Sequence, residues 1–392
     1  MSEEKMVPKL RFSGFNEEWG IKKLSDVSTI NPKTKNLPNE FVYIDLESVE
    51  NGILTKISKI GIDDAPSRAQ RLLDVGDILF QTVRPYQMNN LYFDFDNDNY
   101  VASTGYAQIK SKINSKFLYH YLHYSKFVNN VLKRCTGTSY PAINANDLKK
   151  IKIKIPIDTN EQKMIGSIFD KLDLKIGLLG EKYKYYQDFK KYLMQQIFAQ
   201  KLRFNFDDDW NKVNLGDIST IGKGFTPSTS NPNYWDGDIN WLSIADMNQG
   251  KYITETSKKI TDEGCKNKKI VEKDTLIMSF KLTIGRLGIL KKDMFTNEAI
   301  CNFKWKTSDI LTEYMYYYLS SINILKYGSQ AAKGITLNND TLSTIPVLLP
   351  SIEEQEKIVD ILSNMDTKIQ FIETNIEDVK KFKKGLLQQM FV

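Results

Sequence analysis

Two long stretches of the chain carry apolar residues in steps that alternate between four and three, which is the spacing of a coiled-coil seam. The predicted seam residues are Ile165, Phe169, Leu172, Ile176 and Leu179 in residues 161–198, and Ile358, Leu362, Met365, Ile369 and Ile372 in residues 354–391. Lys190 and Lys383 interrupt the two seams at the same step, 193 residues apart. We therefore expect two helices, each roughly 57 Å long, that pack on one another in antiparallel orientation.

The rest of the chain repeats as well. The segment K-L-R-F-S-G-F-N-E-E-W at Lys9–Trp19 returns as K-L-R-F-N-F-D-D-D-W at Lys201–Trp210. L-S-D-V-S-T-I at Leu24–Ile30 returns as L-G-D-I-S-T-I at Leu215–Ile221. Similar segments recurring at a nearly fixed offset indicate a duplicated architecture. The chain is thus expected to be two similar halves of about 190 residues, a pseudo-dimer within one polypeptide.

Short β-rich runs precede each predicted helix. Phe41–Leu46, Asp77–Val83 and Ile151–Ile155 in the first half are bounded by turn signals such as Asn51-Gly52. The predicted fold class is α+β, with two similar α/β domains separated by a pair of long antiparallel coiled-coil helices. The predicted domains are residues 1–156 and 201–350 as the α/β domains, and residues 157–200 and 351–392 as the central and distal spacer helices.

Composition narrows the class of protein. The 392 residues are 41% hydrophobic and 26% charged, with a net charge of +6, which is ordinary for a globular protein and permits a polyanionic partner. No apolar run reaches the roughly 18 residues of a membrane span, and the first twenty residues lack the apolar core of a signal peptide. Three cysteines and two histidines argue against a disulfide framework or a metal centre. We expect a cytoplasmic protein without a membrane partner.

Taken together, these segments resemble the specificity subunit of a type I restriction–modification system. The resemblance rests on the K-L-R-F…W openings, the G-K-G-F-T-P-S…N-P-N-Y-W-D-G-D-I-N-W-L run at Gly222–Leu242, and the E-Q-K-M-I helix with its second copy. It implies two target-recognition domains, each reading one half of a split site in double-stranded DNA. It also implies that the two helices act as a spacer and as a docking surface for two methyltransferase subunits. The larger complex would add restriction–translocase subunits.

In that family this subunit is not an enzyme. The resemblance therefore implies no catalytic residue and no cofactor in this chain, while S-adenosylmethionine, ATP and Mg would belong to partner subunits. The remaining apolar residues of the helices suit such partners, because they lie off the predicted seam and need cover from another surface. They are Ile168, Leu174, Leu178, Tyr185 and Phe189 in the first helix and Ile361, Phe371, Phe382 and Leu387 in the second.

Candidate DNA-binding residues follow from the chemistry of DNA. Lys and Arg suit phosphates, while amide, hydroxyl and guanidinium groups suit base edges. Loops with such residues occur in both α/β domains, and glycines beside them would let the backbone approach a phosphate closely. The candidates are Arg84, Tyr86, Gln87, Asn89, Thr104, Tyr106, Thr138 and Tyr140 in the first domain, and Lys223, Phe225, Thr226, Lys281, Thr283, Arg286, Lys333 and Thr336 in the second. The loops differ between domains, so the predicted target is asymmetric.

Other interpretations stay open at this point. Asn231-Pro232-Asn233-Tyr234 is similar to the N-P-P-Y loop of DNA adenine methyltransferases, so a self-contained methyltransferase is one alternative, although the segment reads better as a turn. Asp94, Asp96 and Asp98 could belong to a nuclease, although a solvated loop suits them better. His120 and His123 share a helical face but suit a structural role better than a metal site. The clustered tyrosines of both domains suit core packing rather than base stacking. A coiled-coil scaffold without nucleic acid is the last alternative.

Overall fold

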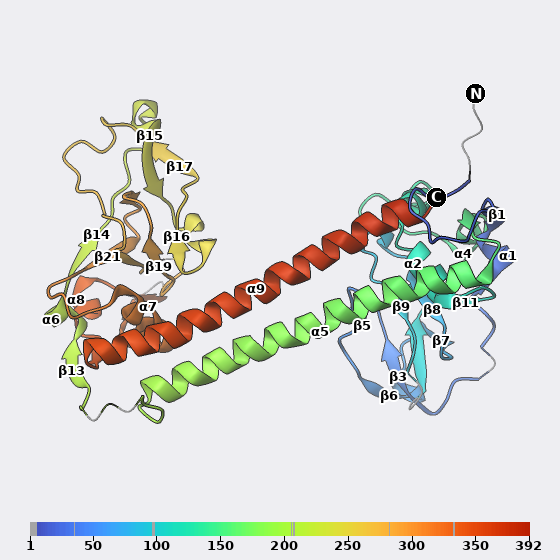
Figure 1. Cartoon of the computed structure of the whole chain (residues 1–392), viewed down its shortest axis with the longest axis horizontal. Helices are drawn as coiled ribbons and strands as arrows, with labels where there is room; N and C mark the ends of the chain where they lie inside the picture. The colour runs from blue at the N-terminus through green and yellow to red at the C-terminus, as the bar shows by residue number, and fades with distance from the viewer. Residues whose placement is uncertain are drawn as a thin grey trace. The chain divides into compact units, whose positions relative to one another are not determined.

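A computed structural model describes residues 6–34, 36–95, 99–204, 206, 208–281, 283–331 and 334–392, and the chain divides into two compact units (Figure 1). Unit 1 comprises Met1–Glu181 and Glu373–Val392, and unit 2 comprises Lys182–Ile372. Each unit therefore holds one α/β module and a part of both long helices. These helices are α5 (Thr159–Phe198) and α9 (Ile352–Met390).

The module of unit 1 is built around two four-stranded sheets, with the strand orders β6-β3-β10-β7 and β2-β11-β8-β9. Its strands are β1 (Gly20–Lys23), β2 (Ser28–Ile30), β3 (Glu40–Ile44), β4 (Val49–Glu50), β5 (Ile53–Leu54), β6 (Lys59–Gly61), β7 (Ala69–Leu72), β8 (Ile78–Gln81), β9 (Leu91–Tyr92), β10 (Tyr100–Ser103), β11 (Tyr106–Ser111) and β12 (Lys152–Ile155). Its helices are α1 (Leu24–Val27), α2 (Ser115–Tyr121), α3 (Ser125–Leu132) and α4 (Ala145–Lys149), with short 3₁₀ turns at Ile62–Asp64 and Pro85–Gln87.

The module of unit 2 has a five-stranded sheet, β14-β21-β18-β19-β16, and a three-stranded sheet, β17-β15-β20. Its strands are β13 (Asn211–Asn214), β14 (Ser219–Lys223), β15 (Trp235–Leu242), β16 (Tyr252–Ile253), β17 (Lys258–Ile260), β18 (Leu276–Ser279), β19 (Leu287–Leu290), β20 (Phe295–Thr296), β21 (Ile300–Trp305), β22 (Ser329–Ala331), β23 (Gly334–Thr336) and β24 (Pro346–Leu349). Its helices are α6 (Leu215–Ile218), α7 (Thr312–Ser321) and α8 (Asn339–Ser343), with 3₁₀ turns at Pro232–Tyr234, Ala245–Gln249 and Ile324–Tyr327.

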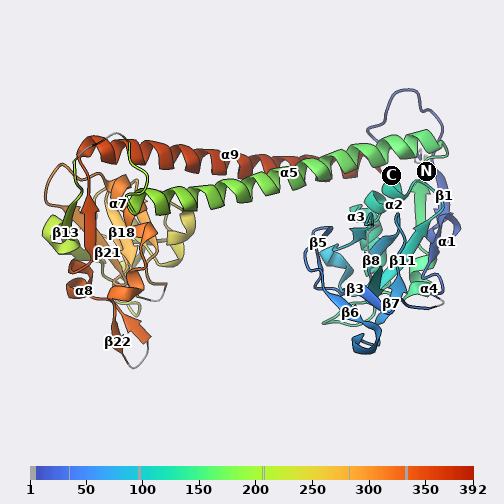
Figure 2. The same ribbon diagram turned by 90° about the horizontal axis from the view of Figure 1, so that it is seen from below.

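The two modules share one topology, as the repeated sequence predicts. The antiparallel order β2-β11-β8 of unit 1 corresponds to β14-β21-β18 of unit 2, and the parallel pair β3·β10 corresponds to β15·β20. The first strand of each module pairs with its last: Gly20 lies opposite Ile155, and Asn211 lies opposite Leu349. Each module thus closes on itself immediately before a long helix begins. In unit 2 the hairpin β22–β23 projects on the side away from the two helices (Figure 2).

The long helices match the predicted stretches closely, and they pack against each other as antiparallel segments within each unit. In unit 1 the ring of Phe391, which follows the end of α9, stacks on Phe169 near the start of α5, with centroids 5.6 Å apart. In unit 2, Ile197 near the end of α5 belongs to the same core as Ile358 and Leu362 of α9. The predicted seam residues Ile165, Phe169, Ile358, Leu362, Met365 and Ile372 are buried, whereas Leu172, Ile176, Leu179 and Ile369 are half-buried. Within the described ranges, no helix combines the length and apolar content needed to cross a membrane.

The lysine that interrupts each seam forms an ion pair with the other long helix. Lys383 of α9 pairs with Asp173 of α5 in unit 1, and Lys190 of α5 pairs with Asp366 of α9 in unit 2. The side chains of both lysines are about one-fifth exposed or less, so the pairs lie at the edge of the helix contact. The same pair is made twice with the roles of the helices exchanged. A polar residue at a seam position of a coiled coil fixes the register of the two helices.

A buried glutamate at the start of each long helix explains the repeated K-L-R-F…W segments. Glu161, 1% exposed, accepts hydrogen bonds from Arg11 Nε (2.7 Å), Arg11 Nη2 (2.8 Å) and Trp19 Nε1 (3.3 Å). Glu354 accepts the equivalent bonds from Arg203 Nε (3.2 Å), Arg203 Nη2 (2.8 Å) and Trp210 Nε1 (3.0 Å). A fork of guanidinium donors matches a carboxylate in two places at once. We call each arrangement a clamp, because it ties the arm before a module to the helix after it.

Candidate nucleic-acid interface

Two loops of unit 1 that carry predicted DNA-binding residues lie side by side. The backbone N–H of Arg84 donates to Pro141 O (2.7 Å), and Val83 forms a β-bridge with Ala142. The guanidinium of Arg84 lies over the ring of Tyr140, 4.2 Å from its centroid. A cation held over an aromatic face keeps both side chains ordered while they remain accessible. The two loops therefore present one polar surface, although they are more than 50 residues apart in the sequence.

The tips of these loops are exposed to solvent. Tyr140 is 64% exposed and Tyr86 is 48% exposed, and Thr138 is exposed beside them. Arg84 and Met88 both adopt left-handed backbone conformations, with φ of 54° and 53°, which is uncommon for residues other than glycine. These two residues flank the 3₁₀ turn Pro85–Gln87 and give the loop a sharply bent shape. Backbone strain of this kind is typical of loops that serve binding.

Four further candidates of unit 1 occupy different settings. The side chain of Gln87 accepts a hydrogen bond from Gln81 Nε2 (2.8 Å), and that of Asn89 accepts one from Asn51 N (3.1 Å), so both amides support the loop. Thr104, half-buried, lies in the turn between β10 and β11, and its N–H donates to Arg68 O (2.9 Å). Tyr106 is 1% exposed inside the core, so we withdraw it as a DNA-binding residue. Burial raises the pKa of its hydroxyl.

In unit 2 the predicted loop after β14 is held by the turn between β20 and β21. Gly224 N–H donates to Ile300 O (3.1 Å), and Phe225 N–H donates to Thr296 O (2.8 Å). A Cβ on Gly224 would lie 2.2 Å from Thr296 O, so this glycine is required for packing. Its role in bringing the backbone close to a phosphate stays a prediction. Lys223 stays exposed, and Thr226 is half-buried and accepts a bond from Asn297 Nδ2 (2.9 Å).

The loop between β18 and β19 adjoins the same turn, because Phe280 N–H donates to Ala299 O (3.0 Å). Buried Ser279 closes this loop: its N–H donates to Arg286 O (2.9 Å), and its hydroxyl donates to Thr283 O. Lys281 and Thr283 are exposed, and Arg286 is half-buried. Of the other two candidates, Thr336 ends strand β23 and Lys333 lies outside the described residues.

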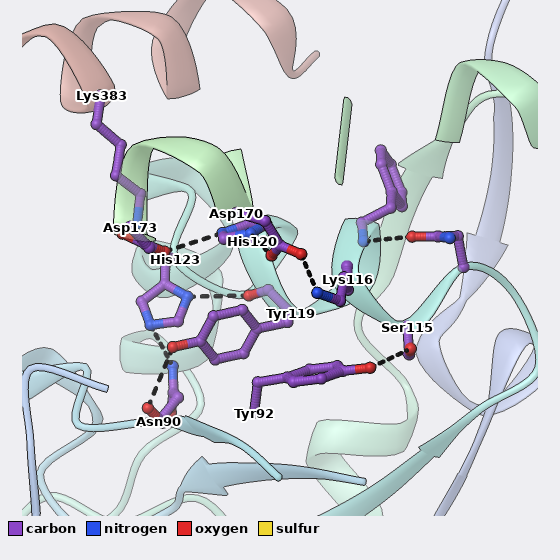
Figure 3. A network of polar contacts seen from close by, with 12 residues as sticks. Asn90, Tyr92, Ser115, Lys116, Tyr119, His120, His123, Asp170, Asp173 and Lys383 are labelled. Atoms are coloured by element: carbon purple, nitrogen blue, oxygen red, sulfur yellow. Dashed lines mark hydrogen bonds and ion pairs between the residues drawn. The ribbon is translucent and has the colours of Figure 1, made fainter. Parts of the chain in front are cut away.

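The two histidines of unit 1 lie where its α/β module packs against α5 (Figure 3). His120 Nε2–H donates to Asp170 Oδ1 (2.9 Å), and Asp170 also pairs with Lys116. His123 Nδ1–H donates to Tyr119 O (2.9 Å), which leaves Nε2 to accept from Asn90 (3.3 Å).

Both histidines are therefore structural. Burial lowers the pKa of His120, and it lowers the pKa of His123 to about 4, so both are neutral at physiological pH. The acidic partners of His120, which the sequence did not reveal, come from α5. Among the described residues, no three His, Cys, Asp or Glu side chains form a group suited to a metal ion.

In unit 2, different residues connect the α/β module to the long helix. Tyr317 occupies the place of His120, and its hydroxyl donates to Asp366 Oδ2 (2.5 Å). Lys251 Nζ donates to Tyr317 Oη (3.1 Å) and to Ser363 Oγ (3.1 Å), and burial lowers the pKa of Lys251. The clustered tyrosines of both modules are otherwise core residues: Tyr119, Tyr121, Tyr124, Tyr314, Tyr317 and Tyr318 are buried and Tyr316 is half-buried. This confirms the packing interpretation.

The local geometry of residues 231–234 favours a turn over the loop of an adenine methyltransferase. In the Asn231–Tyr234 segment, the side chain of Asn231 accepts a bond from the N–H of Asn233 (3.1 Å) and caps a 3₁₀ turn. Thr261 Oγ1 donates to Asn233 O (2.7 Å) and fixes the turn against the module, as the interpretation of a turn predicts. Of the acidic residues considered for a nuclease, Asp96 and Asp98 lie outside the described residues.

Comparison with known proteins finds a matching family, related sequences and a similar fold. The family model described as the type I restriction modification DNA specificity domain matches this chain twice, at residues 16–184 and 207–381. The HindI type I restriction enzyme specificity subunit of Haemophilus influenzae is 23% identical over 436 residues, covering 88% of this chain and 93% of that protein. The MjaIX specificity subunit of Methanocaldococcus jannaschii is 30% identical over 191 residues, which is 47% of this chain and 44% of that protein. The type I restriction–modification S subunit from M. genitalium has a similar fold, with a TM-score of 0.62, 16% identity and 99% of each chain covered.

Proposed function

The chain belongs to the family of type I restriction–modification DNA specificity proteins, and on this premise we propose that it is the subunit that reads the DNA target. Residues 1–156 and 201–350 are the two target-recognition domains, and each reads one half of a split site in double-stranded DNA. Residues 157–200 and 351–392 are the spacer helices. The two halves of the site differ in sequence, because Arg84-Pro85-Tyr86 in one domain stands where the other has Lys281-Leu282-Thr283.

The observation that carries this proposal is the meeting of predicted loops in each module. In unit 1 the loops of Arg84 and Tyr140 are joined by backbone contacts, and in unit 2 the loops of Lys223 and Lys281 adjoin one turn. Basic side chains at such tips suit phosphates, and the Arg84 guanidinium or the Thr138 hydroxyl suits base edges. The scaffold beneath the loops is the same in both modules, while the side chains on them differ.

Each unit also exposes apolar side chains at equivalent helix positions. Leu178 and Phe371 correspond to one another, as do Phe189 and Phe382, with an offset of 193 residues in both cases. Unit 1 exposes Leu178 and Phe382, and unit 2 exposes Phe371 and Phe189. Two equivalent apolar patches suit two copies of one partner. We assign them to two methyltransferase subunits, with restriction–translocase subunits completing the complex.

The methyltransferase and restriction–translocase subunits would then perform the catalysis of the complex. They would bind S-adenosylmethionine, ATP and Mg, and this chain would carry no cofactor and perform no catalysis. The capped turn at Asn231 supports this assignment, because its side chain is already engaged with its own backbone. A protein that acts on chromosomal or invading DNA in this way works in the cytoplasm.

Mapping of methylated adenines tests the recognition role. Cells that carry this chain with its companion subunits should show one two-part, asymmetric methylated motif. Arg84→Ala/Tyr140→Ala should weaken methylation or relax one half of the motif only, whereas Lys175→Ala, at an exposed position of α5, should change neither half. Exchange of residues 1–156 for a homologous domain should replace that same half. Methylation without any motif would favour a scaffold, and methyl-donor binding by the isolated chain would favour a self-contained methyltransferase.

Co-purification tests the docking surface. Leu178→Lys and Phe371→Lys, each alone, should reduce the number of bound methyltransferase copies from two to one, and the double variant should bind none. Lys175→Glu, an exposed change of charge on the same helix, is the control and should leave both copies bound. Two copies retained by the double variant would contradict this assignment.

A further inference from the structure

A lysine-lined hollow lies on the module of unit 2, beside the predicted loop after β14. It has a volume of about 280 Å³, and its lining includes Thr220, Lys223, Lys269, Glu272, Asn302 and Lys304. Thr220 lies opposite Lys304, and Gly222 lies opposite Asn302, in the antiparallel pair β14·β21. Side chains on directly opposed residues share one face of a sheet. The hollow is therefore built on the strand that leads into the loop of Lys223.

The charge of this hollow is not neutralised within the chain. The ammonium groups of Lys223, Lys269 and Lys304 make no ion pair or hydrogen bond with any described residue, and all three side chains are exposed. The amide of Asn302 is also without a hydrogen-bond partner among the described residues, and it lies over Gly222, where a Cβ would come within 2.3 Å of Asn302 Oδ1. Glu272 is the one carboxylate in the lining, so the hollow keeps an excess of positive charge.

Unit 1 has a hollow at the equivalent place, in which the counterparts of Lys304 and Asn302 are already engaged. It has a volume of about 200 Å³, and its lining includes Lys33, Asp74, Gln108 and Lys110, of which Lys33 is exposed. Lys110, the counterpart of Lys304, pairs with Asp74, and the amide of Gln108 donates to Asp77 Oδ2 (2.7 Å) and Leu72 O (2.8 Å). In unit 2 the counterpart of Asp74 is Glu272, because Val271 N–H donates to Met294 O as Leu73 N–H donates to Tyr100 O. Glu272 lies in the lining but forms no ion pair with a described lysine, so Lys304 stays unpaired. The two modules thus share the hollow and differ in the pairing of its charges, because Lys110 is paired and Lys304 is not.

We infer that the hollow of unit 2 binds a backbone phosphate of the DNA duplex through Lys223, Lys269 and Lys304, with the Thr220 hydroxyl and the Asn302 amide as further donors. Lysine ammonium groups act as point charges toward phosphate and carry no information about the base sequence. This site deepens the proposed DNA-recognition role and rests on it. It sets the register of the second module on the duplex, while the equivalent hollow of unit 1 makes no such contact.

The test measures binding of the full-length chain to a 40-base-pair duplex of random sequence over a range of salt concentrations. Each phosphate contact makes the slope of log affinity against log salt more negative by about 0.9. Lys269→Gln/Lys304→Gln should therefore make the slope less negative by about 0.9 and weaken binding roughly fivefold at 0.15 M salt. Lys292→Gln is the matched control, because Lys292 is exposed in the same module but pairs with Glu255. It should leave the slope unchanged.

A reciprocal variant tests the reason for the difference between modules. Asp74→Asn releases Lys110 in unit 1, so it should strengthen binding and make the slope of log affinity against log salt more negative by up to about 0.9. If the unchanged chain binds the duplex but Lys269→Gln/Lys304→Gln keeps its slope and affinity, the hollow is not a phosphate site and the recognition role still stands. If the unchanged chain binds no duplex at any salt concentration, the recognition role fails and this inference fails with it.

Discussion

The contacts of the clamp around Glu161 allow the change in free energy caused by replacing its carboxylate with an amide to be worked out. Glu161→Gln keeps the volume of the side chain but removes its charge and turns an amide donor toward the guanidinium donors of Arg11. Breaking one partner of a buried, hydrogen-bonded ion pair costs 3 to 5 kcal/mol or so. The side chain of Arg11 keeps 15% exposure, so water compensates in part. We therefore expect the free energy that holds the arm of residues 6–19 to fall by about 3 kcal/mol.

Hydrogen exchange reports this loss directly. Within the arm, Trp19 N–H donates to Met6 O (2.8 Å) and Leu10 N–H donates to Gln389 O (3.0 Å). Since 1.4 kcal/mol is a factor of ten, about 3 kcal/mol speeds exchange of these amides roughly a hundredfold. Glu181→Gln, the same substitution at an exposed position of the same helix, should leave the rates unchanged. Exchange in the Glu161→Gln arm within about threefold of the unchanged protein would refute the clamp as the attachment of this arm.

Three further predictions concern stability. The pKa of His123 lies at about 4 in the folded state and near 6.5 in the unfolded chain, so the unfolded chain binds the extra proton. The free energy of unfolding of unit 1 should therefore fall by roughly 3 kcal/mol as pH falls from 6.5 to 4. Urea midpoints for His123→Gln should depend less on pH, and an unaltered dependence would contradict this. A double-mutant cycle of Lys383→Met and Asp173→Asn should give a coupling energy of about 1 kcal/mol, since the pair is partly exposed, and a coupling near zero would exclude a stabilising pair. Gly177→Ala should raise the melting temperature through a gain of about 0.5 to 1 kcal/mol, because the added Cβ meets no atom within 4 Å; a lower melting temperature would show that the glycine is needed.

The long helices and the duplication could be predicted from the sequence because their signals are local and repeated. The predicted stretches 161–198 and 354–391 differ from α5 and α9 by at most two residues at each end. The sequence also showed that Lys190 and Lys383 break the seams together. It could not show why, because each lysine pairs with an aspartate about 200 residues away in the chain.

The settings of individual site residues were harder to predict. Tyr106 looked like a loop residue, yet it begins β11, whose first four residues are all buried, so alternation gave no warning of its burial. Lys269 and Lys304 were not selected, because nothing in a single strand shows that two lysines will line one hollow. Arg84 and Tyr140 were selected separately, and only the fold shows that they touch.

The composition of unit 1 has a consequence for how the protein is made. Its core contains Phe117 and Phe169 from early in the chain together with Leu386, Met390 and Phe391 from its last residues. Unit 2 is one uninterrupted segment, Lys182–Ile372. At a synthesis rate of about 5 to 20 residues per second, the first module waits roughly 10 to 40 s on the ribosome for the residues that complete it. The half that is translated second is therefore the first that can finish folding, and premature termination near the 3′ end of the message would damage the half encoded at the 5′ end.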